Sequence, residues 1–157
     1  MSKIAVSKLE QLIKNIVLDS QKLKDEFTDA HNVPVNYACI FTQNQSELTE
    51  YTSVASKIGQ VIEYTPTAPL FKITPIKTIA GSLQLLKIRK FDEDHTDLGD
   101  ADFTLPNYQQ FKDKYLGQPG FSLVSKPGFE MIELRVSDRS VRCYFSNPPL
   151  DKQLGLI

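Results

Sequence analysis

The segment DADFTLPNYQQFKDKYLGQ, residues 100–118, contains a predicted strand followed at once by a predicted helix. Its first part, Asp100–Leu105, has the composition of a strand. Asn107 and Gln110 then have capping-box spacing, which favours a helix start, and Gly117 is placed to end that helix. A strand that leads directly into a short helix is therefore the unit we expect in this chain.

The same order of elements occurs earlier in the chain. Val35–Thr42 (VNYACIFT) is a strand by composition, Ser46 can cap the next helix, and Gly59 is placed to end it. The two helices finish in similar phrases, IGQ at 58–60 and LGQ at 116–118. The shared order of elements is a stronger sign of duplication than these three residues.

Three extended runs follow each predicted helix, separated by proline, glycine or polar turns. They are QVIEYTP, LFKITPI and SLQLLKIRKF in the first half, and FSLVSK, FEMIELRV and VRCYF in the second. We therefore predict an α+β fold of two tandem βαβββ modules, residues 33–91 and 99–147, that form one curled sheet of mixed or antiparallel strands. The tail after Phe145 contains Pro148 and Pro149 and is expected to run over the surface.

An extra amphipathic helix is predicted in the N-terminal extension, residues 1–30. Its apolar residues recur at helical spacing: Leu9, Leu12, Ile13, Ile16 and Val17. This stripe must be buried, either against the chain's own sheet or against a second copy in a homodimer. At 157 residues, the whole chain 1–157 fits a single domain.

The charge balance and hydropathy exclude several classes of partner. Eighteen basic and nineteen acidic residues give a net charge of −1, so no overall field attracts nucleic acid or an anionic membrane. No run approaches the roughly 20 apolar residues that span a bilayer. The N-terminus lacks the apolar core of a signal peptide, so a cytoplasmic location is expected.

The cysteines and histidines do not suggest chemistry by themselves. Cys39 and Cys143 lie inside apolar runs, where small buried hydrophobic residues are the usual interpretation. His31 lies at a helix-to-strand junction, and His95 lies in the acidic connection DEDHTDLG at 92–99. We interpret both histidines as loop residues and the acidic connection as a solvated loop, because EF-hand spacing is absent.

Alternation along the strands divides the predicted sheet into two faces. The apolar face, which helices would cover, contains Leu86, Ile88, Ala101, Phe103, Leu105, Ile132, Leu134, Val141, Cys143 and Phe145. The polar face contains Lys87, Arg89, Asp100, Asp102, Thr104, Glu133, Arg135, Arg142 and Tyr144. The polar face is either a solvated side of an antiparallel sheet or, if the sheet curls, the inside of a cup that binds a ligand.

The repeated βαβββ order resembles the vicinal oxygen chelate (glyoxalase/bleomycin-resistance) superfamily over residues 33–147. The extra N-terminal helix and the phrase GDADFTL, residues 99–105, are similar to its YecM-like bacterial branch. The resemblance implies that paired modules build a cup-shaped sheet around a metal site. It also implies that the ligands, commonly two histidines and two glutamates, come from the first and last strand of each module.

Few residues at the matching positions suit a metal. The resemblance places these residues there: Asn36 or Tyr37, Lys87 or Arg89, Asp100 and Asp102, and Arg142 or Tyr144. Only Asp100 and Asp102 are suitable oxygen ligands, and Glu133 is a candidate third. Lysine or arginine at the other matching positions would repel a divalent ion. A divalent metal cofactor is therefore the alternative to binding without a metal.

Three functions follow from these observations. The first is a binding protein for a small anionic or oxygen-rich molecule, held in the cup without a metal by Tyr37, Lys87, Arg89, Arg135, Arg142 and Tyr144. The second is a metal-dependent lyase, isomerase or dioxygenase of the glyoxalase type that uses Asp100, Asp102 and Glu133. The third is an interaction protein that uses the N-terminal helix.

Overall fold

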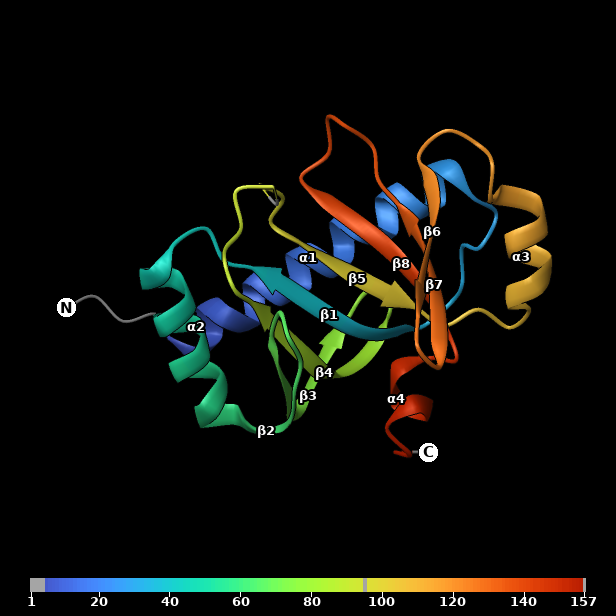
Figure 1. Cartoon of the computed structure of the whole chain (residues 1–157). Helices are drawn as coiled ribbons and strands as arrows, with labels where there is room; N and C mark the ends of the chain where they lie inside the picture. The colour runs from blue at the N-terminus through green and yellow to red at the C-terminus, as the bar shows by residue number, and fades with distance from the viewer. Residues whose placement is uncertain (1–4, 95, 157) are drawn as a thin grey trace.

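The computed structural model describes residues 5–94 and 96–156 (Figure 1). Its elements, in chain order, are α1 (Val6–Phe27), β1 (Val35–Phe41), α2 (Gln45–Ile58), β2 (Gly59–Tyr64), β3 (Pro69–Thr78), β4 (Gly81–Arg89), β5 (Gly99–Phe103), α3 (Tyr108–Tyr115), β6 (Phe121–Lys126), β7 (Phe129–Leu134), β8 (Val141–Asn147) and α4 (Leu150–Gln153). The predicted α+β class, with a helix ahead of the first strand, is confirmed.

The strands form one eight-stranded sheet in the order β2-β3-β4-β1-β5-β8-β7-β6. β1 pairs in parallel with β4, and β5 pairs in parallel with β8. All the other pairs are antiparallel, so the sheet is mixed. β2 and β6 are its two edges.

The antiparallel pairing of β1 with β5 joins the two halves of the sheet. Ala38 lies opposite Ala101, and both are fully buried on the side that α1 covers. Gly99 lies opposite Ile40, where a Cβ atom would come 2.2 Å from the carbonyl oxygen of Cys39 and 2.9 Å from Ile16 Cδ1. Small residues along this seam therefore let α1 pack directly on the sheet.

Helix α1 packs its apolar stripe against its own sheet. Its residues Leu9, Ile13, Ile16, Val17 and Leu23 are buried in the core, together with the apolar face predicted from alternation. Its main contacts are with β8 and β5, and Figure 1 shows it crossing behind the sheet. The stripe is thus not available to a partner. An interaction function therefore cannot use the apolar stripe of the N-terminal helix.

No helix in the described residues combines the length and apolar character needed to cross a membrane.

The short helices begin at asparagine caps. For α3 the predicted cap is confirmed, because the Asn107 side chain accepts a hydrogen bond from the Gln110 amide at 3.1 Å. For α2 the prediction of Ser46 is wrong by two residues. The Asn44 side chain accepts from the Glu47 amide, and the Glu47 carboxylate accepts from the amide of Gln43, the residue before the cap.

The tail after β8 is more ordered than predicted. Instead of only running over the surface, it forms the short helix α4, and Leu150 is buried beside Tyr37, Leu70 and Leu85. These three residues lie on the face of the sheet opposite α1. The tail therefore contributes to the second, smaller apolar cluster.

We expect Ile13→Ala to lower the free energy of unfolding by about 2–5 kcal/mol, because it leaves a cavity under a fully buried side chain. Urea unfolding followed by circular dichroism measures the change. Lys14→Ala, at the adjacent exposed position, is the matched control and is expected to change stability by less than about 0.5 kcal/mol. Equal effects of the two substitutions would contradict the packing of α1.

Candidate functional site

A row of four chemically active side chains crosses the centre of the sheet. Cys39 on β1 is in register with Lys87 on β4 and with Asp100 on β5, and Asp100 is in register with Arg142 on β8. Residues in register point to the same side of a sheet. The row thus runs cation, thiol, carboxyl, cation on the face opposite α1.

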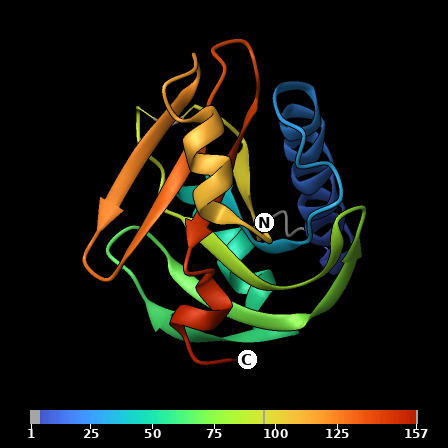
Figure 2. The ribbon, with the colours of Figure 1, turned by 90° about the vertical axis from the view of Figure 1, so that its right-hand side faces the viewer.

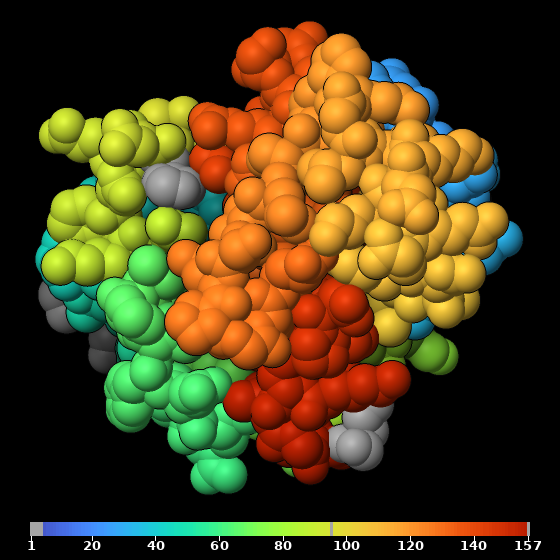
Figure 3. Space-filling view, turned by 45° about the vertical axis from the view of Figure 1, so that its right-hand side comes forward, coloured from blue at the N-terminus to red at the C-terminus, as the bar shows by residue number. Residues whose placement is uncertain are grey.

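This face encloses a cavity of about 530 Å³. Its lining includes Glu63 of the edge strand β2 and Val124 of the opposite edge strand β6, together with Leu150 of α4. Residues from both edges can line one cavity only if the sheet curls. Figure 2 shows the red α4 between the orange β6–β7 hairpin and the green strands, and Figure 3 shows these three segments meeting at the surface.

Four of the six predicted ligand-binding residues line the cavity: Tyr37, Lys87, Arg89 and Tyr144. The other two do not line it. Arg142 is buried beside the cavity, and Arg135 is exposed. Asp100 also lines the cavity, whereas Asp102 and Glu133 do not.

Arg142 is held in a buried ionic network. Its Nε donates to Asp97 Oδ2 at 2.6 Å, and one Nη donates to Glu133 Oε2 at 3.4 Å. Tyr144 Oη donates to the same Glu133 oxygen. Burial lowers the pKa of Arg142, but the hydrogen bond to Asp97 contributes to a net rise above the ordinary value. The interpretation of Asp97 as a solvated loop residue is wrong, because only 8% of it is exposed.

Asp100 and Asp102 are buried carboxyl groups on the same strand. Burial raises the pKa of Asp100 to about 8, and the charge of Asp102 adds to the rise. Burial raises the pKa of Asp102 to about 7, even though its carboxylate accepts hydrogen bonds from the Ser146 hydroxyl and amide. Among the described residues, Asp100 Oδ1 has no hydrogen-bond partner. The raised pKa favours the protonated form of Asp100, and its buried Oδ1 is left unpaired.

The polar face is thus not a solvated surface. Asp100, Asp102 and Arg142 are at most 5% exposed, which overturns that interpretation. Burial also raises the pKa of the Tyr37 and Tyr144 hydroxyls well above their ordinary value, so both keep their protons.

The cysteines are buried and unpaired, as predicted. Burial raises the pKa of both thiols, which disfavours the nucleophilic thiolate. Cys39 nevertheless contributes to the cavity lining.

The residues present do not fit the divalent metal that the resemblance implies. Within residues 5–94 and 96–156, no three His, Cys, Asp or Glu side chains come together as a ligand group. Lys87 and Arg142 occupy the two ends of the central row, and Glu133 is already engaged by Arg142 and Tyr144. His31 is exposed, with its Nε2 beside the carbonyl oxygens of Asp25 in α1 and of Thr28, and His95 lies outside the described residues.

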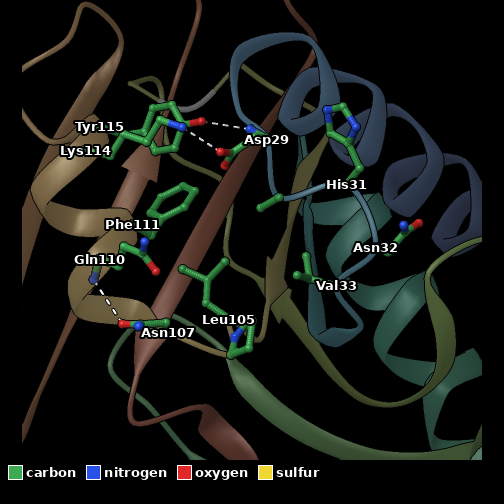
Figure 4. A pocket seen from close by; sticks show the side chains of 12 residues that line it. Asp29, His31, Asn32, Val33, Leu105, Asn107, Gln110, Phe111, Lys114 and Tyr115 are labelled. Carbon is green, nitrogen blue, oxygen red and sulfur yellow. Dashed lines mark hydrogen bonds and ion pairs between the residues drawn. The ribbon is translucent and has the colours of Figure 1, made fainter.

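A second cavity, also about 530 Å³, lies between the loop after α1 and helix α3 (Figure 4). Several of its polar groups are already paired with one another. Lys114 forms an ion pair with Asp29 at 2.6 Å, and the Asp29 amide donates to the Tyr115 hydroxyl at 2.8 Å. These bonds tie the loop to α3, so the cavity inside the curled sheet is the better candidate site.

Comparison with known proteins supports the fold rather than a function. No protein-family model matches the chain, and no curated protein matches its sequence. The chain is similar to a structural-genomics structure named protein EC4020, with a TM-score of 0.69 and 9% identity over 93% of this chain and 92% of that one. At this identity, the likeness shows a shared fold alone.

Another solved structure is a glyoxalase/bleomycin resistance protein/dioxygenase superfamily member from Vibrio splendidus 12B01. Its TM-score is 0.40, with 8% identity over 73% of this chain and 97% of that one. A TM-score this low supports no conclusion about the present chain.

The raised pKa of Asp100 predicts how stability changes with pH. Between about pH 4 and pH 8 the folded protein keeps a proton that the unfolded chain, with a pKa of 3.8, releases. The free energy of unfolding therefore falls as pH rises through this window. Asparagine cannot ionise, so the Asp100→Asn variant lacks this fall. We expect its free energy of unfolding, relative to that of the wild type, to rise from pH 5 to pH 8 by up to about 1.4 kcal/mol per pH unit.

Urea unfolding at several pH values measures this difference. Asp138→Asn, at an exposed position, is the control and is expected to keep the wild-type dependence. A constant difference between Asp100→Asn and wild type across the window would show that Asp100 ionises normally.

Proposed function

We propose that this protein binds a small anionic or oxygen-rich molecule inside the curled sheet, without a metal ion. The observation that carries the proposal is the composition of the cavity lining. Lys87, Arg89 and Lys126 supply three cations, Glu63 supplies one anion, and Asp100 is mainly neutral at pH 7. The lining is therefore net positive in a chain whose overall charge is −1.

The two central cations are free to bind a ligand. In the described part of the chain, neither Lys87 nor Arg89 forms an ion pair with a carboxylate. Lys87 Nζ lies 4.9 Å from the centre of the Tyr37 ring, and the Arg89 guanidinium lies 5.4 Å from that of Phe41. These contacts orient the cations and leave their hydrogen-bonding capacity for an anion.

We further infer that the sheet is a duplication, with residues 33–91 and 99–147 as two βαβββ modules of one domain that spans residues 1–157. The order of elements and the matching parallel pairs β1–β4 and β5–β8 support this inference. Membership of the glyoxalase superfamily, and of its YecM-like branch, is proposed on the same order of elements. A cytoplasmic location is proposed from composition.

The alternative functions receive less support from the geometry. A metal-dependent enzyme would need Asp100, Asp102 and Glu133 as ligands, and the described residues do not gather them as a set of three. An interaction protein would need a partner-facing surface other than the apolar stripe of α1. The binding function needs neither a set of metal ligands nor a partner-facing surface.

We expect Lys87→Met and Arg89→Met each to weaken the binding of any anion that the wild-type protein binds. Loss of one charged hydrogen-bond donor costs about 1.5–3 kcal/mol, so the dissociation constant should rise about 10- to 100-fold. Isothermal titration with phosphate, citrate and octanoate measures the effect. Lys77→Met, exposed on β3, is the control, and unchanged affinity in the Lys87/Arg89 double variant would refute the proposal.

We expect divalent ions to leave the melting temperature unchanged, because Lys87 and Arg142 lie in the same row as Asp100 and repel a divalent ion. Thermal unfolding with millimolar Mn²⁺, Ni²⁺, Zn²⁺ or Fe²⁺ provides the test, since a ligand of the native state stabilises it by mass action. A stabilising shift that disappears in Asp100→Asn would instead support the metal-dependent alternative.

A further inference from the structure

We propose that the ligand is an amphipathic monocarboxylate whose head group lies over Cys39, between Lys87 and Asp100, and whose apolar body lies against the β6–β7 hairpin. This inference rests on the proposed function, since it names the chemical class of molecule that the same cavity binds. Two separate features of the cavity lead to it, a narrow polar slot and an apolar wall.

The slot is formed by the differing sizes of neighbouring side chains. On β1, the small Cys39 lies between Tyr37 and Phe41, which point to the same side of the sheet. Across the sheet, Lys87 and Asp100 are each one strand away from Cys39, so their Cα atoms are roughly 10 Å apart. Because Cys39, Lys87 and Asp100 all line the cavity, the space above the small Cys39 side chain is open to the head group of a ligand.

The two ends of the slot provide complementary contacts for a carboxylate. Lys87 donates from a cation at one end, and Arg89 lies two residues further along the same strand. At the other end, the Asp100 side chain lines the cavity. The raised pKa of Asp100 favours its protonated form, and a protonated carboxyl group can donate a hydrogen bond to a bound carboxylate.

The wall opposite the slot is mostly apolar, with Lys126 as its one cation among the described residues. Val124 and Met131 form a cross-strand pair on the hairpin, and both line the cavity, as do Phe129 and Leu150. Val124, Phe129 and Met131 are only partly buried by the protein itself. A small polyanion such as citrate would leave these side chains in contact with water, whereas an alkyl or aryl chain would cover them.

A chain-length series tests the proposal. Titration of the wild-type protein with acetate, butyrate, hexanoate and octanoate should give affinities that rise about fourfold for each methylene group buried. Inorganic phosphate is the comparison without an apolar body and should bind more weakly than octanoate.

Two pairs of matched variants locate the bound molecule. Cys39→Leu should fill the slot and reduce octanoate affinity at least tenfold, whereas Ser53→Leu, at an exposed position on α2 outside the cavity, should leave it unchanged. Val124→Ser should weaken octanoate about fivefold and flatten the chain-length series. Leu123→Ser changes the neighbouring residue, whose side chain points to the other face of β6, and should have no effect. Melting temperatures of all four variants confirm that they are folded.

The outcomes separate this inference from the function on which it rests. Rising affinity along the series, lost in Cys39→Leu, supports the proposal. Equal binding of acetate, octanoate and phosphate that still depends on Lys87 and Arg89 overturns the amphipathic ligand and leaves the anion-binding function standing. Failure of every anion to bind the wild-type protein removes both.

Discussion

The close pairing of β1 with β5 is the constraint on which the rest of the structure depends. It holds the two halves of the sheet in one layer, and it requires small residues where α1 crosses: Ala38, Gly99 and Ala101. The same pairing aligns Cys39 with Asp100 on the opposite face. Because side chains alternate along a strand, the packing of α1 and the chemistry of the cavity are set by a single register.

Charge is divided between two neighbouring parts of the polar face. Asp97 and Glu133 neutralise Arg142 in a buried network, and the removal of one partner from such a network leaves an uncompensated charge. Lys87 and Arg89, on the other side of β1, have aromatic rings rather than carboxylates beside them. Acidic side chains thus stabilise the deep cation and leave the accessible cations for a ligand.

Local patterns predicted most of the fold. Alternation identified the apolar face, which lies beneath the helices, and helical spacing identified α1. The start of α2 was misplaced because Ser46 and Asn44 are both good caps, and only the reciprocal bonds of Glu47 distinguish them. Helix α4 was missed because a four-residue helix after two prolines has no periodicity to detect.

The candidate site was harder to predict, since it depends on curvature and burial. Alternation placed Lys87, Arg89, Asp100 and Tyr144 on one face, and the structure brings them into one cavity. Alternation could not show that Arg142, unlike these residues, is held away from the cavity. Arg142 is held by Asp97, which is 45 positions away in a segment predicted to be solvated. The unpaired oxygen of Asp100 also has no signal in the sequence, because it arises from what surrounds the side chain.

Helix α4 gives the cavity a part of its lining that does not belong to the sheet. Leu150 and Gln153 line the cavity, yet they contribute no strand and no part of the main core. Changes in this short segment can therefore reshape the space offered to a ligand without disturbing strand register. One part of the cavity lining can thus diverge in sequence while the paired strands that carry the charged residues stay the same.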